Sequence, residues 1–283
     1  MATAVLLISC PDRPGLVHAV AEFVLRLDGN ILHAEQHTDR EAEVFFQRVE
    51  FDFAEAQISR TDIGVAFVSV AQKYDMSFSL RFDDERPRIA LLASREVHCL
   101  ADLLGRWRSG ELPAEIVAVI SNHPDHAGLA EYSGVPFHHL PVTPDTRAQQ
   151  ERELVRLLGE YDVEAVVLAR YMQVLGESVL EAFPSRIINI HHSFLPAFVG
   201  AKPYHQAQHR GVKIIGATAH YASAELDEGP IIAQDVVAVS HRDAVSDLIR
   251  KGRDLETVVL ARAVRAHVEH RTLVFGNKTI VFS

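Results

Sequence analysis

Cysteine is scarce in this chain: Cys10 and Cys99 are the only two among 283 residues. They lie far apart in sequence and in no metal-like spacing, which argues against a disulfide framework. No apolar run reaches the ~18 residues of a membrane span, and the start of the chain lacks the basic segment of a secretory signal. We therefore expect a soluble protein of the cytoplasm with no membrane partner.

Positive charge is also in short supply: the chain has 28 Lys and Arg residues against 38 Asp and Glu residues, which gives a net charge of -10. Proteins that bind nucleic acids usually carry a basic face that neutralises phosphates. The balance therefore favours a small-molecule substrate and no nucleic-acid partner. The length of 283 residues suffices for two domains that each bury a core.

The first 83 residues alternate between apolar strands and helices. Residues 4–10 read as a buried strand, after which Leu16, Val20 and Phe23 recur at helical spacing. The further expected elements are strands over 31–38, 44–53 and 77–82 and a helix over about 55–73. The order is βαββαβ, which predicts a ferredoxin-like unit over residues 1–83.

A tight turn at residues 12–15, which reads Asp-Arg-Pro-Gly, joins the first strand to the first helix. Together with Asn30 at the next boundary, this turn resembles the ACT domain, a regulatory module that commonly binds amino acids between paired copies. The resemblance implies that Asp12, Pro14, Gly15 and Asn30 are regulatory residues that bind an amino-acid effector, for which glycine and methionine are the candidates to try first. It also implies a homo-oligomer, either a dimer or a tetramer. The alternative is a turn that caps its helix and binds nothing.

The charged run from Asp83 is closed by Pro87 and suits an exposed linker over residues 84–88, so residues 89–283 form the second domain. Short apolar strands are expected over 89–93, 116–121, 136–139, 165–168 and 187–190. Helices are expected to begin near residues 95, 125, 146 and 176, with a last one over 255–270. This α/β pattern predicts a mostly parallel, Rossmann-like sheet that binds ligands at the carboxyl ends of its strands.

Polar side chains stand at the ends of these strands. Asn189 and His191 lie two apart, so their side chains project to the same side, and Asp227 lies in a Leu-Asp-Glu-Gly-Pro run. A formamide carbonyl must be polarised, attacked and proton-balanced, which an amide, an imidazole and a carboxylate can do. The pattern resembles the catalytic core of enzymes that use 10-formyltetrahydrofolate. That resemblance implies that Asn189, His191 and Asp227 are catalytic and that His220 supports them.

The resemblance extends to the binding of the folate. Residues 166–175 are similar to the family's pterin-pocket segment, and apolar walls with free backbone groups suit a flat heterocycle. The implied folate contacts are Met172, Val174, Leu175, Ala222 and Ser223. Arg147 corresponds to a basic residue near the glutamate tail of the substrate. Without the resemblance, the apolar members of this set would read as core packing.

The sequence predicts no metal and no cofactor, since 10-formyltetrahydrofolate is itself the substrate. His205 and His209 are four apart, a spacing that can bind zinc on a helix, but the chain has no His-Glu-x-x-His motif. Ser193 lacks the Gly-x-Ser-x-Gly context of a nucleophilic serine.

The acceptor of the formyl group distinguishes the branches of the family. Transferases to glycinamide ribonucleotide carry a glycine-rich phosphate cradle after the first strand, whereas residues 93–98 lack it and Glu96 would repel a phosphate. Methionyl-tRNA formyltransferases add a C-terminal barrel that binds tRNA, and we expect no room for such a barrel in this chain. The whole chain thus resembles the formyltetrahydrofolate deformylase family, which implies hydrolysis to formate and tetrahydrofolate and a supply of formate for purine biosynthesis. The alternatives are a formyltransferase to an amine acceptor and a non-enzymatic amino-acid sensor.

Overall fold

The computed structural model describes residues 2–53, 58–196 and 203–283, which form two compact units. Unit 1 comprises Met1–Arg86 with Glu269–Leu273 and Val281–Ser283, and unit 2 comprises Pro87–Val268 with Val274–Ile280. None of the helices within the described ranges is both long enough and apolar enough to cross a membrane.

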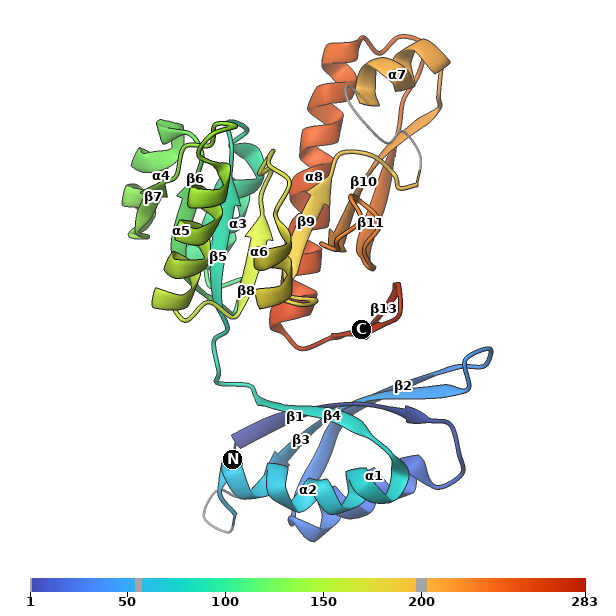
Figure 1. Cartoon of the computed structure of the whole chain (residues 1–283). Coiled ribbons are helices and arrows are strands. Elements are labelled where there is room, and N and C mark those ends of the chain that lie inside the picture. Colours follow the sequence, from blue (N-terminus) through green and yellow to red (C-terminus); the bar gives the residue numbers. More distant parts are fainter. Residues whose placement is uncertain (1, 54–57, 197–202) are drawn as a thin grey trace. The chain divides into compact units, whose positions relative to one another are not determined.

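Unit 1 has the predicted ferredoxin-like order. Its elements are β1 (Ala2–Pro11), α1 (Leu16–Arg26), β2 (Asn30–Asp39), β3 (Val44–Phe53), α2 (Arg60–Tyr74) and β4 (Ser77–Phe82). The antiparallel sheet has the strand order β2-β3-β1-β4, and both helices lie on one of its faces (Figure 1). Helix α2 begins later than expected because the Ser59 hydroxyl caps it by accepting the amide hydrogen of Asp62. Residues 54–57, where the expected helix started, lie outside the described ranges.

The end of the chain belongs partly to unit 1, which differs from the predicted single span of residues 89–283 for the second domain. The Nε of Arg48 on β3 donates to the carbonyl oxygen of His270 at 3.2 Å. The backbone amide and the hydroxyl of Ser283 both donate to a carboxylate oxygen of Glu35 on β2, at 2.8 and 2.7 Å. Strands β12 (Thr272–Phe275) and β13 (Lys278–Val281) form a separate two-stranded sheet.

Unit 2 is built on the expected mostly parallel sheet, and two further strands extend it. Its strands are β5 (Arg88–Ala93), β6 (Glu115–Ser121), β7 (Phe137–His139), β8 (Ala165–Leu168), β9 (Ile187–His191), β10 (Ile214–Tyr221) and β11 (Ile231–Ala238). The order is β11-β10-β9-β8-β5-β6-β7, with β10 antiparallel to both of its neighbours and the other pairs parallel. The sheet therefore changes direction of growth at β5, whose carboxyl end marks a topological switch point.

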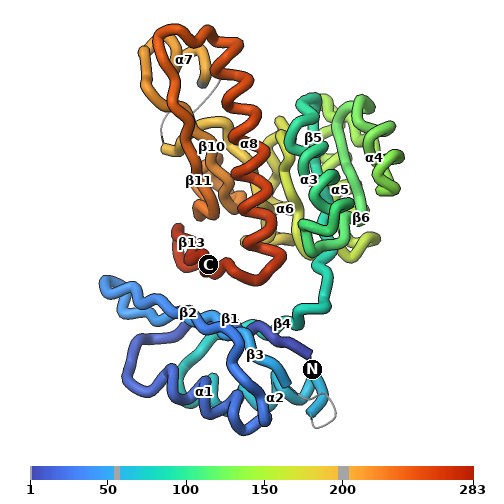
Figure 2. Tube along the Cα trace, turned by 180° about the vertical axis from the view of Figure 1, so that it is seen from behind, coloured from blue at the N-terminus to red at the C-terminus, as the bar shows by residue number. Residues whose placement is uncertain are grey.

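Helices cover both faces of this sheet because its strands carry apolar side chains on both sides. The helices are α3 (His98–Arg108), α4 (Ala127–Ser133), α5 (Arg147–Glu160), α6 (Glu177–Ala182), α7 (Pro203–Arg210) and α8 (Val245–Val268), with a short 3₁₀ turn η1 (Pro124–His126). Ile89 and Leu91 of β5 face α3 and α8, whereas Ala90 and Leu92 face α5 and α6 (Figure 1, and from behind in Figure 2). Helix α8 begins ten residues before the expected start at 255.

Candidate active site

A pocket of about 480 Å³ lies at the carboxyl ends of β8 and β9, beside the end of β10. It is lined by most of the residues that the sequence singled out: Asn189, His191, His220, Asp227, Met172, Val174, Leu175, Ala222 and Ser223. Met172 and Val174 are 57% and 55% exposed, so their apolar side chains can contact a ligand in the pocket. Arg147 does not line the pocket, but its guanidinium donates to the carbonyl oxygen of Val174 at 2.6 Å.

The polar side chains of the pocket form one connected group. The Nδ1 of His191 lies 3.2 Å from one carboxylate oxygen of Asp227, and the Nε2 of His220 lies 3.7 Å from the other. The Nδ1 of His220 lies 2.9 Å from the carbonyl oxygen of Tyr221, which can only accept, so this nitrogen carries a proton. The amide nitrogen of Asn189 lies 3.2 Å from the Nε2 of His220.

His191 presents one nitrogen to the carboxylate and keeps the other available. Its Nε2 is buried and has no hydrogen-bond partner among the residues that the structure describes. Because the ionised Asp227 accepts a hydrogen bond from the N–H at Nδ1, Nε2 is the nitrogen left to act on a bound substrate. The hydrogen bond from His191 holds the pKa of Asp227 well below its usual range, so this carboxylate stays ionised at neutral pH.

The loop that carries Asp227 is held tightly against the end of β10. Asp227 has a φ of 60°, a left-handed conformation that is uncommon outside glycine. A Cβ at Gly229 would overlap the carbonyl oxygen of Tyr221, so only glycine allows the loop to lie this close. The Leu-Asp-Glu-Gly-Pro run therefore fixes the position of the carboxylate.

Comparison with known proteins places the chain in a family. The formyl transferase model matches residues 87–264, and the ACT domain model matches residues 4–60. A formyltetrahydrofolate deformylase of a Synechocystis species is 55% identical over 99% of both chains. The chain belongs to the formyltetrahydrofolate deformylase family.

Solved structures separate this family from its transferase relatives. The crystal structure of a formyltetrahydrofolate deformylase from Pseudomonas syringae pv. tomato matches with a TM-score of 0.97 and 48% identity, covering 100% of this chain and 95% of that one. Glycinamide ribonucleotide transformylase 1 from Symbiobacterium toebii matches with a TM-score of 0.67 and 36% identity, and covers 72% of this chain and 98% of that one. The resemblance to the deformylases thus includes the ACT domain as well as the formyltransferase-type sheet.

Strand pairing explains why residues from two distant segments meet in this deformylase-type site. On the antiparallel pair β9 and β10, His220 lies opposite Asn189 and Thr218 lies opposite His191. The Thr218 hydroxyl donates to the carbonyl oxygen of Ser193 at 2.9 Å and accepts the amide hydrogen of Leu195 at 3.1 Å. This buried threonine therefore holds the turn that follows His191, and Ser193 is part of that turn.

Sequence reasoning missed two charged or titratable side chains that line the same pocket, Arg170 and His192. Arg170 follows the apolar strand β8 and has a φ of 63°. Burial and the nearby charge of Arg170 lower the pKa of His192 to about 4, so its imidazole is neutral at pH 7. The only signal for Arg170 in the sequence is a charge immediately after a continuous apolar run.

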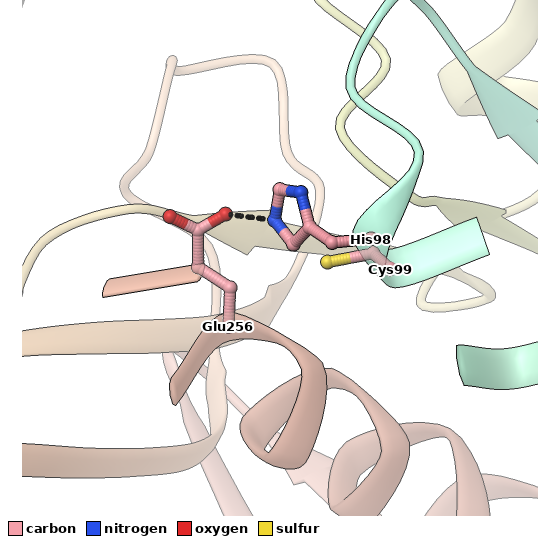
Figure 3. A group of neighbouring side chains, drawn as sticks. All are labelled: His98, Cys99 and Glu256. Carbon is pink, nitrogen blue, oxygen red and sulfur yellow. Dashed lines mark hydrogen bonds and ion pairs between the residues drawn. The ribbon is translucent and has the colours of Figure 1, made fainter. Parts of the chain in front are cut away.

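One group of potential metal ligands gathers within the described residues: His98, Cys99 and Glu256 (Figure 3). Burial raises the pKa of the Cys99 thiol, so the thiolate that binds a metal is strongly disfavoured. The Nε of Arg170 lies 3.4 Å from Glu256, which places a positive charge where a cation would sit. These three residues do not fit a metal ion. His205 and His209 are both exposed on α7.

The predicted regulatory residues lie on the surface of unit 1 but not all at one place. Asp12, Pro14 and Gly15 are exposed in the turn before α1, and Gly15 caps that helix with a φ of 93°. Asn30 follows the other end of α1, and its backbone amide donates to a carboxylate oxygen of Asp52 at 2.8 Å. An 11-residue helix, about 16 Å long, separates the two groups within one copy of the chain.

Proposed function

We propose that this protein hydrolyses 10-formyltetrahydrofolate to formate and tetrahydrofolate through Asn189, His191 and Asp227. The observation that carries the proposal is the His191 ring, whose Nδ1 faces an ionised Asp227 while its Nε2 stays unpaired within the described residues. The membership in the deformylase family over the whole chain supports the same reaction. Formate released in this way is a one-carbon source for purine biosynthesis, and we place the reaction in the cytoplasm.

The apolar side of the pocket suits the flat pterin ring. Met172, Val174 and Leu175 lie on one segment of the lining, and Ala222 and Ser223 lie on another. Binding of a heterocycle over exposed apolar side chains is favourable, by roughly 25 cal/mol per Å² of apolar surface that is removed from water. The Arg147 guanidinium, which is half exposed beside the pocket segment, is the group we assign to the glutamate tail.

Hydrolysis then follows from the polar side of the pocket. Asp227 and His191 hold a water molecule for attack on the formyl carbon, and the Nε2 of His191 takes up its proton. The second amide hydrogen of Asn189 and the imidazolium of His191 stabilise the oxyanion that develops. When the carbon–nitrogen bond breaks, N10 of the folate takes the proton, and formate and tetrahydrofolate leave. His220 positions Asn189 by accepting one of its amide hydrogens at Nε2, beside Asp227.

The assay is release of formate from 10-formyltetrahydrofolate with no acceptor present. Asp227→Asn and His191→Ala should each lower kcat by roughly 10²- to 10⁴-fold, with little change in folate affinity, because each removes an acid-base partner and leaves the pterin wall intact. His209→Ala removes an exposed histidine on α7 and is the matched control, with unchanged turnover expected. A chelator should leave activity intact. Near-normal turnover in either site variant would contradict the assignment.

We propose further that unit 1 senses an amino acid and pairs copies of the chain. Strands β2 and β4 form the edges of its sheet, and open edges favour association with a second copy. Pairing would allow the residue 12–15 turn of one copy to approach Asn30 of another, which one copy alone does not do. Glycine and methionine are the effectors to test, and the assembly is a dimer or a tetramer.

A further inference from the structure

A charged residue that the proposed reaction does not use lies deep in unit 2. Glu256 on α8 is 1% exposed. One of its carboxylate oxygens accepts the hydroxyl hydrogen of Tyr204 at 2.7 Å, and the other lies 2.8 Å from the Nε2 of His98 and 3.4 Å from the Nε of Arg170. Burial raises the pKa of Glu256, but the bonds from His98 and Tyr204 and the charge of Arg170 more than offset it, so the carboxylate is ionised.

This carboxylate lies beside the start of α3, within 2.8 Å of the side chain of His98. His98 is the first residue of α3, which begins after β5 at the switch point of the sheet. Helix N-termini at such points bind phosphates through their free amides and dipole. Figure 3 shows Glu256 reaching from α8 to the start of α3, where it faces His98 and Cys99. An ion pair at 2.6 Å between Arg253 of α8 and Glu96 lies beside it.

The position of the carboxylate is fixed from several sides. Gly252 lies one helical turn before Glu256, and a Cβ there would overlap the Tyr204 hydroxyl. The missing side chain therefore lets the buried Tyr204 ring lie across α8 and reach Glu256. On the opposite side, Arg170 contacts the carboxylate and also lines the pocket that holds His191 and Asp227. The buried cluster thus adjoins the reacting centre.

We infer that Glu256, held by His98 and Tyr204, is a specificity-determining residue that excludes phosphorylated amine acceptors and leaves water as the acceptor. The inference rests on the proposed hydrolysis. A phosphate at the start of α3 would meet an ionised carboxylate in a buried site, and a like charge placed against it there is strongly unfavourable. Arg170 is neutralised by the same carboxylate, so the chain supplies its own anion in place of the substrate's.

The test compares the wild-type chain with Glu256→Gln and Asp254→Asn. The first change removes the buried charge with little change of shape, and the second removes one negative charge from an exposed position on the same helix. Formate release from 10-formyltetrahydrofolate is measured with increasing inorganic phosphate and, separately, with glycinamide ribonucleotide. Wild type and Asp254→Asn should be indifferent to both. Glu256→Gln should be inhibited by either compound at concentrations at least about tenfold below any that affect the wild type, because Arg170 and the start of α3 are then free to bind the anion.

The outcomes separate this inference from the proposed function. If the wild type releases no formate, the proposed function fails. If formate is released but a folded Glu256→Gln variant is as indifferent to phosphate and ribonucleotide as Asp254→Asn, the inference is wrong. The wild-type arm needs no variant to fold: inhibition of the native enzyme by submillimolar phosphate, or formylation of the ribonucleotide, also overturns it. Formylated ribonucleotide made only by Glu256→Gln would support it.

Discussion

At the scale of single residues, two neighbouring histidines have opposite electrostatic surroundings. His191 faces the ionised Asp227, whereas His192 is partly buried next to Arg170. The first arrangement orients the His191 ring through its Nδ1, and the second keeps a neutral His192 ring in the pocket wall. Because the pKa of Asp227 is held so low, we expect its protonation to matter only in strong acid.

The neutral state of His192 predicts a loss of stability in mild acid. Its pKa is about 4 in the folded chain and 6.5 as the ordinary value, so the unfolded chain binds more protons between these limits. The free energy of unfolding therefore falls as pH decreases from 7 to 5, by about 1–2 kcal/mol from this residue. Urea unfolding of wild type and His192→Gln at both pH values measures the effect, and the variant should lose less stability. His209→Gln, at an exposed site, should keep the wild-type dependence, and equal losses in all three proteins would contradict the prediction.

At the scale of elements, the site depends on a loop that contacts the end of β10. Gly229→Ala would place a methyl group on the Tyr221 carbonyl oxygen and displace Asp227 from His191. A shift of about 1 Å can cost on the order of 10²-fold in rate, so we expect a drop of that size in kcat. Gly159→Ala is the control, because a Cβ in that helix meets nothing within 4 Å among the described residues. Wild-type kcat in Gly229→Ala, measured by formate release, would show that the loop tolerates the methyl group.

The elements of the parallel sheet could be predicted because their sequences are continuously apolar. Strands β8 and β9 begin at residues 165 and 187, as expected, and α5 and α6 begin within one residue of the expected positions. The expected start of α8 is too late because the first turns of this helix are rich in charge. Leu248 in those turns nevertheless packs against α7 and β10. Polar composition concealed a helix that tertiary packing stabilises.

Predictability was lower for contacts between distant segments. Asn189, His191 and Asp227 were singled out by spacing and by family resemblance, and the structure brings them together in one pocket. Arg170 and Glu256 are 86 residues apart, and no local pattern indicates that they meet. Such pairs depend on strand order and helix packing, which a single sequence does not specify.

At the scale of the whole molecule, the return of the chain end to unit 1 affects how regulation can be tested. A fragment without residues 1–86 would leave Glu269–Leu273 without the partners it has in unit 1, including Arg48. Loss of activity in such a fragment would therefore mix regulation with misfolding. Point substitutions in the full chain avoid this difficulty.

The open edge of the unit 1 sheet provides the last prediction. Leu32 on the edge strand β2 is 50% exposed, so Leu32→Glu should place a charge in the expected pairing surface and shift the oligomer toward monomer. Leu25→Glu is the matched control, since Leu25 is 72% exposed on helix α1 and not on an edge strand. Light scattering gives the mass, and calorimetry with glycine or methionine gives binding. If the ligand site needs two copies, Leu32→Glu loses amino-acid binding together with assembly and keeps formate release. A wild-type monomer that binds neither amino acid would contradict both roles, whereas binding retained by a monomeric variant would place the effector site within one copy.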